Sequence, residues 1–88
     1  MTLDDASNII HILACNIAQC YFSLGKYDES VTYCDKALEA DKSYVRAYYR
    51  KISCFIAMKR TIEAGEMLKL ALSIDPKNEQ LLSLKNKV

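Results

Sequence analysis

The stretch ACNIAQCYFSLGKYDESVTYCDKALEADKS at residues 14–43 returns, in altered form, as YYRKISCFIAMKRTIEAGEMLKLALSIDPK at residues 48–77. Ala37 aligns with Ala71 and Leu38 with Leu72, so one constant shift along the chain, which we call the repeat offset, relates the two stretches. Small residues at fixed places in each unit let antiparallel helices approach one another closely. The repeat offset therefore predicts two stacked helix–turn–helix repeats.

The apolar residues recur at the helical period along most of the chain, and no alternating β-branched run is present. Only two glycines and one proline interrupt this pattern. The sequence therefore predicts an all-α protein. We expect helices at residues 4–24, 28–41, 44–58, 61–74 and 78–88.

Several residues indicate where these helices begin and end. Gly25 is placed to end the first helix in a left-handed conformation. Thr61 is expected to be an N-cap, and Asn78 is expected to cap the final helix. Thr2 and Asp5 have the spacing of a capping box at the start of the first helix.

Composition excludes several classes of function. The chain has 88 residues, enough for one small domain, and a formal net charge of +1, whereas nucleic-acid-binding domains are usually strongly basic. No apolar run approaches the roughly 20 residues that span a bilayer. The start MTLDDASN lacks the features of a signal peptide, so we expect a cytoplasmic protein with no membrane or nucleic-acid partner.

The residues that usually carry metal or catalytic chemistry are isolated. Cys15, Cys20, Cys34 and Cys54 show no CxxC spacing, and His11 is the only histidine. All four cysteines fall in apolar helical stripes, so we expect buried, reduced thiols and no metal site. With no glycine-rich phosphate loop and no partner for His11, we expect no enzyme activity and no cofactor.

The segment NIAQCYFSLGKYDESVTYCDKALEADKSYVRAYYRKI at residues 16–52 resembles the tetratricopeptide repeat domains of co-chaperones, particularly those of FK506-binding immunophilins. The LGKY turn, the KAL near the end of the second helix and the DP at the end of the second unit carry the resemblance. Ile52 and Lys42 depart from the family pattern, where a small residue and a proline are usual.

This resemblance implies one domain, residues 1–88, built as a right-handed superhelical stack. It would contain repeats at 11–44 and 45–78 and a capping helix at 79–88. The domain is expected to be a fragment of a longer protein, in which any prolyl isomerase activity belongs to a separate upstream domain.

Helical spacing predicts a site rich in hydrogen-bond donors on the concave side of the stack. Asn16 and Arg50 are separated by the repeat offset and hold the same place in successive repeats, and Arg46 lies one turn before Arg50. Gln19 and Tyr49 share this face. Because no carboxylate faces the arginines, an anion from another molecule is expected to bind there.

The resemblance identifies this arrangement with the dicarboxylate clamp, which binds the C-terminal Glu-Glu-Val-Asp of 70-kDa or 90-kDa cytosolic heat-shock chaperones. Asn16, Arg46 and Arg50 match three of its five positions. The other two, a lysine and an asparagine, belong to a preceding repeat that this sequence lacks.

Two alternatives to chaperone-tail binding remain open. The chain could be a general scaffold for internal peptides. It could also associate with itself through an apolar cluster near its start that includes Ile9, Ile10 and Leu13.

Overall fold

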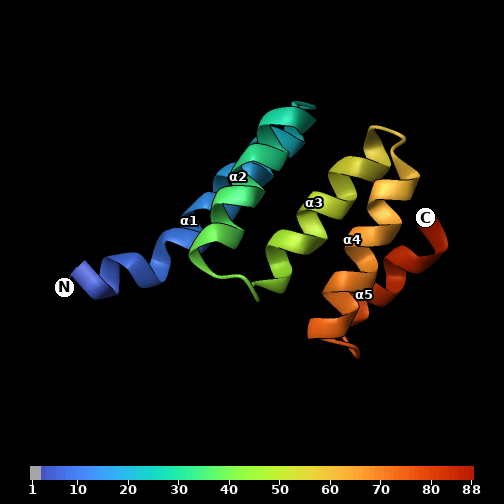
Figure 1. Cartoon of the computed structure of the whole chain (residues 1–88). Helices are drawn as coiled ribbons and strands as arrows, with labels where there is room; N and C mark the ends of the chain where they lie inside the picture. The colour runs from blue at the N-terminus through green and yellow to red at the C-terminus, as the bar shows by residue number, and fades with distance from the viewer. Residues whose placement is uncertain (1–2) are drawn as a thin grey trace.

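The computed structural model describes the backbone of residues 3–88 and the side chains of residues 9–88. The predicted capping box of Thr2 and Asp5 lies outside these described side chains. The described residues form five α-helices and a short 3₁₀ turn, with no strand among them, which confirms the all-α prediction (Figure 1). The elements are α1 Leu3–Ser23, α2 Tyr27–Ala40, α3 Val45–Ala57, α4 Thr61–Ile74, α5 Glu79–Leu84 and the 3₁₀ turn η1 Lys85–Lys87.

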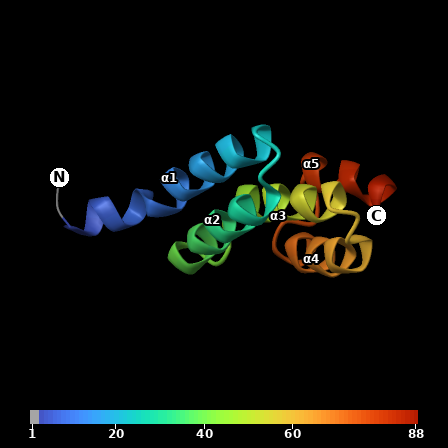
Figure 2. The same cartoon turned by 90° about the horizontal axis from the view of Figure 1, so that it is seen from above.

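The helices stack as two antiparallel pairs followed by a short cap. The first pair is α1 and α2, the second is α3 and α4, and α5 packs against the second pair (Figures 1 and 2). The N-terminal part of α1 projects beyond the end of α2 in both views. No helix among residues 3–88 is long and apolar enough to cross a membrane.

The first helix of each pair ends in the same turn. At the end of α1, Gly25 has a φ of 76°, and the Lys26 amide donates to the Tyr21 carbonyl at 2.9 Å. At the end of α3, Lys59 has a φ of 62°, and the Arg60 amide donates to the carbonyl of the residue five positions earlier at 2.8 Å. Both are Schellman turns with a left-handed residue after the last helical turn. Gly25 and Lys59 are separated by the repeat offset, so the backbone follows the sequence repeat.

The helix starts agree with the sequence predictions in one case and differ in another. Asn78 caps α5 as expected, because its Oδ1 accepts a hydrogen bond from the Leu81 amide at 3.0 Å. The prediction for Thr61 is wrong: Arg60 is the N-cap, and Thr61 is already the first residue of α4. The C-terminal helix is also shorter than expected, since the α-helix ends at Leu84 and continues as η1.

A buried hydrogen-bond chain joins the first three helices. Ser30 of α2 is fully buried and donates to the Ala18 carbonyl of α1 at 2.7 Å. The Cys54 thiol of α3 in turn donates to Ser30 Oγ at 3.2 Å. A buried hydroxyl is costly without partners, so this chain stabilises one arrangement of the first pair on α3.

The core of the second pair is closed by α5. Leu81 is fully buried and Leu84 is 2% exposed, and both pack in one cluster with Leu68 and Tyr48. Ile52, which departs from the family pattern, is fully buried in the same cluster. A bulky residue at this position is thus part of the core.

The cysteines do not all behave as predicted. Three of them, Cys15, Cys34 and Cys54, are buried and free, but Cys20 is exposed, so the expectation for Cys20 is wrong. Cys20 corresponds to Cys54 in the repeat. Cys54 lies against Ser30 of the preceding helix pair, whereas no preceding pair covers Cys20 within the described residues. Burial raises the pKa of Cys34 to about 12 and also raises the pKa of Cys54.

Candidate functional site

Four of the five predicted site residues line one cavity of about 250 Å³ between α1, α3 and α5. Gln19 comes from α1, whereas Arg46, Tyr49 and Arg50 come from successive turns of α3. The remaining lining residues are Cys15 and Gln80. We call this cavity the arginine pocket. Helical spacing on two helices thus brings these side chains together, as the sequence predicts.

Aromatic rings hold the Arg50 side chain in place. Its guanidinium carbon lies 4.8 Å from the centroid of the Phe22 ring and 5.8 Å from that of the Tyr49 ring. The Phe22 ring itself packs edge-on against Tyr27, with centroids 5.3 Å apart. An arginine stacked on a ring keeps its N–H groups in the guanidinium plane free to donate. Arg50 is therefore oriented in advance of any ligand.

Neither arginine of the pocket forms an ion pair with another side chain in residues 9–88. Among the described side chains, the ion pairs are Lys51 with Asp35 at 2.6 Å and Arg60 with Glu63 at 3.9 Å. Both lie outside the arginine pocket. The positive charge of Arg46 and Arg50 is thus available to an anion from outside.

The pKa of the buried Cys15 thiol, which lines this pocket, reflects the charges of both arginines. Burial raises the pKa of Cys15, and the charges of Arg50 and Arg46 oppose this effect by favouring the thiolate. Both guanidinium charges therefore act on the same group at the wall of the arginine pocket. Because desolvation remains the larger effect, Cys15 stays a neutral thiol at neutral pH.

Asn16 stands apart from the other predicted residues. It is exposed and lines a neighbouring open hollow of about 530 Å³ with Gln19, Cys20, Ser23 and Leu24. Gln19 is the residue that lines both this hollow and the arginine pocket. The predicted set of donors is thus divided between two adjoining concavities.

Sequence reasoning missed two residues that shape the arginine pocket. Gln80 of α5 lies one repeat offset after Arg46, so carrying this offset into the cap would have identified it. Phe22, which supports Arg50, offered no comparable signal, since an aromatic residue at this spacing usually indicates core packing. No group of three or more His, Cys, Asp or Glu side chains that could hold a metal ion occurs within the described part of the chain.

Comparison with known proteins agrees with the repeat architecture. Models of the tetratricopeptide repeat match residues 13–44 and residues 45–78. The Hsp70/Hsp90 co-chaperone cns1 of Schizosaccharomyces pombe is 31% identical over 74 residues, which cover 82% of this chain and 21% of that protein. The peptidyl-prolyl cis-trans isomerase PASTICCINO1 of Arabidopsis thaliana is 30% identical over 75 residues, covering 85% of this chain and 11% of the relative.

A solved structure shows the same arrangement of helices. It is the second TPR domain of the human RPAP3 protein in complex with the HSP70 peptide SGPTIEEVD, with a TM-score of 0.80 and 27% sequence identity. The match covers 88% of this chain and 65% of that domain chain. The chain therefore spans only a small part of these two curated relatives and about two thirds of a solved domain. With consecutive repeat models matching residues 13–78 and this shared fold, the chain belongs to the tetratricopeptide repeat family.

Proposed function

We propose that this chain is a protein-interaction module that binds the acidic C-terminal tail of 70-kDa or 90-kDa cytosolic heat-shock chaperones. The observation that carries the proposal is the pairing of Arg46 and Arg50 in one pocket with no acidic partner among the described side chains. Guanidinium groups bind carboxylates through charge-assisted hydrogen bonds, and a terminal carboxylate offers two acceptor oxygens. No catalytic step is assigned to these residues.

The relatives support a chaperone ligand over other anions. One is named as an Hsp70/Hsp90 co-chaperone, and the similar solved domain holds a peptide that ends in EEVD. In our proposal Arg46 and Arg50 contact the terminal carboxylate, while Gln19 and Tyr49 contact the tail beside it. Asn16 contributes a neutral donor from the adjoining hollow.

The proposal is tested by comparing the free-acid peptide SGPTIEEVD with its C-terminal amide, using fluorescence anisotropy at low and high salt. We expect the free acid to bind and the amide to lose most of the signal, because the amide removes the charge that the guanidiniums pair with. Charge-assisted hydrogen bonds contribute about 1.5–3 kcal/mol, so Arg50→Ala should weaken binding by about tenfold or more. Added salt should weaken binding too, since the pocket is open to solvent.

The matched control is Arg60→Ala, which removes the same charge from an arginine outside both the pocket and the hollow. It should leave binding within about twofold of the unmodified chain. Equal binding of the free-acid and amidated peptides would overturn the proposal and favour a general scaffold that binds internal peptides.

A second candidate function is self-association through α1. Leu13 is 53% exposed, and the neighbouring isoleucines on the same helix are similarly open to solvent: Ile9, Ile10, Ile12 and Ile17. We infer that two copies bury this apolar surface against each other. Sedimentation equilibrium should show concentration-dependent association that Leu13→Lys abolishes. Leu70→Lys is the control, because Leu70 is 48% exposed on α4, and a strictly monomeric chain at high micromolar concentration would refute the inference.

A further inference from the structure

The outer face of α1 carries no charged side chain over about four helical turns. Residues 9–24 contain no Asp, Glu, Lys or Arg, and six large apolar residues among them are 37–70% exposed. His11, the one histidine, packs against the Tyr44 ring with centroids 4.6 Å apart. A charged partner would find no counter-charge on this face, whereas a second copy of the same face meets it without like-charge repulsion.

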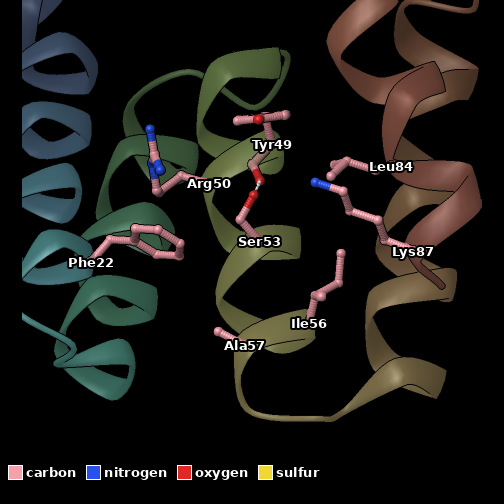
Figure 3. A pocket seen from close by; sticks show the side chains of 8 residues that line it. All are labelled: Phe22, Tyr49, Arg50, Ser53, Ile56, Ala57, Leu84 and Lys87. Carbon is pink, nitrogen blue, oxygen red and sulfur yellow. Dashed lines mark hydrogen bonds between the residues drawn. The ribbon is translucent and has the colours of Figure 1, made fainter.

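The inner side of α1 is already occupied by the rest of the chain. Phe22 points from α1 toward Arg50 at a cavity of about 280 Å³, which adjoins the arginine pocket and is also lined by Lys87 (Figure 3). Ala14 is buried in one cluster with Ala37 of α2. A second molecule can therefore approach α1 only on its outer face.

The open hollow beside the arginine pocket lies on this outer face and has the geometry of a coiled-coil hole. Four of its lining residues, Asn16, Gln19, Cys20 and Ser23, are spaced i, i+3, i+4 and i+7 along α1, and Leu24 adds an apolar edge. In a coiled coil, four residues at this spacing form the hole that receives one side chain, the knob, of the facing helix. The hollow thus suits a side chain presented by another helix.

The same helix supplies a knob for this hole. Leu13 is 53% exposed and lies seven residues before Cys20, so the two share one side of α1. If two copies of α1 run antiparallel about a two-fold axis near residues 16 and 17, Leu13 of each copy faces Cys20 of the other and enters its hollow. One isologous contact then fills both holes. Asn16 lies near the axis, where a single asparagine can fix the register of paired helices.

We propose that self-association and chaperone-tail binding exclude each other at this hollow. Two copies of α1 pair antiparallel, and Leu13 of the second copy covers Asn16 and Gln19, which the tail would otherwise contact. The inference rests on the proposed function and on the second candidate, and it adds the register of the pair and its effect on the peptide site. A high concentration of the chain closes this site, and a bound tail keeps the chain monomeric.

Sedimentation equilibrium of the unmodified chain, with and without the peptide SGPTIEEVD, measures the exclusion. A ligand that binds only the monomer must raise the dissociation constant of the dimer. With free peptide at about nine times its Kd, that constant should rise about a hundredfold, tenfold for each copy in the pair. The C-terminal amide of the peptide is the matched control and should lose most of this effect.

Leu13→Cys tests the register through a disulfide with Cys20 of the second copy. In the antiparallel pair the introduced thiol faces Cys20, so oxidised glutathione should produce a covalent dimer on non-reducing electrophoresis. Adding Cys20→Ser should abolish this cross-link, whereas in a parallel pair the two introduced thiols would face each other and the cross-link would persist. The unmodified chain should stay unlinked, because the antiparallel register separates its two Cys20 positions by about 10 Å along the helix. Leu70→Cys on α4 is the control for random collision.

The covalent Leu13→Cys dimer connects the register to peptide binding. By fluorescence anisotropy it should bind SGPTIEEVD at least about tenfold more weakly than the same variant after reduction. If it binds equally well and the peptide leaves the dimer's dissociation constant unchanged, the exclusion is refuted and both candidate functions stand.

The remaining outcomes separate this inference from the proposed function. If the chain stays monomeric and Leu13→Cys forms no cross-link, the inference fails together with the second candidate, while binding of the free-acid peptide still supports the proposed function. If the free acid and the amide bind equally, the proposed function fails and the exclusion fails with it. The cross-link then still decides whether two copies of α1 pair antiparallel.

Discussion

Lys59 occupies a backbone conformation that suits glycine, and replacing it should stabilise the protein. Its φ of 62° lies in the left-handed region, which costs a residue with a side chain about 1–2 kcal/mol. Glycine avoids this cost but gives the unfolded chain more freedom, which offsets about 0.4–1 kcal/mol. Lys59→Gly should therefore raise the free energy of unfolding by about 0.5–1 kcal/mol. For a domain of this size the midpoint of thermal unfolding should rise by about 2–8 °C.

Gly25 provides the reciprocal test, because it holds the same place in the first repeat with a φ of 76°. A Cβ added at Gly25 would meet no atom within 4 Å, so Gly25→Ala changes the backbone preference and nothing else. The free energy of unfolding should fall by about 1 kcal/mol. Far-UV circular dichroism during urea and thermal unfolding measures both variants.

Lys36→Gly is the control, since Lys36 is exposed within α2 and glycine there should destabilise the helix by about 1 kcal/mol. The same lysine-to-glycine change thus has opposite signs at the two positions. If Lys59→Gly destabilises the protein as Lys36→Gly does, the turn after α3 is not the Schellman turn described above, and the equivalence of the two repeats fails at this point.

Three further predictions concern thiols and the C-terminal cap. In the native protein one thiol, that of the exposed Cys20, should react fast with Ellman's reagent at pH 8, and Cys20→Ser should remove this fast phase alone. Burial raises the pKa of the Cys34 thiol from 9.0 to about 12, so the neutral thiol's contribution to stability is complete below pH 9 and is lost as pH rises toward 12. In urea titrations across this pH range, the free energy of unfolding should therefore fall less for Cys34→Ala than for the unmodified chain. Leu81→Ala should lower the free energy of unfolding by about 2–5 kcal/mol in a urea titration, whereas the half-exposed Leu82→Ala should cost less than about 1 kcal/mol.

The helices and the repeat could be predicted from the sequence because their signal is periodic and therefore redundant. The error at Thr61 occurred because a single residue was interpreted by its local propensity. Thr61 favours an N-cap as an isolated threonine, yet it aligns with Tyr27, and each is the first residue of its helix. The observed caps, Lys26 and Arg60, are separated by the repeat offset, so the second helix of each pair begins at the equivalent place.

Prediction of the candidate site had a similar limit. The repeat offset identified the positions on α1 and α3 but was not carried into the C-terminal segment. There the same offset relates Arg46 to Gln80, which lines the arginine pocket. It also relates Ser53 to Lys87, which lines the adjoining cavity. The separation of Asn16 from the arginines could not be predicted in this way, because equivalent positions in successive repeats lie on different helices and need not share one cavity.

The charges of α3 show why the arginine pocket has no ion pair among the side chains that the structure describes. Lys51 directly follows Arg50 in sequence but points to another face of α3, where it pairs with Asp35 of α2 at 2.6 Å. Asp35 is thus within reach of this helix, and it pairs with Lys51 and not with either arginine. Guanidinium groups exposed to solvent lower the stability of the fold little. An acidic side chain in the arginine pocket, by contrast, would compete with any incoming carboxylate. The same helix therefore uses Lys51 to join the repeats, and its two arginines form no ion pair with the described side chains, as the proposed function requires.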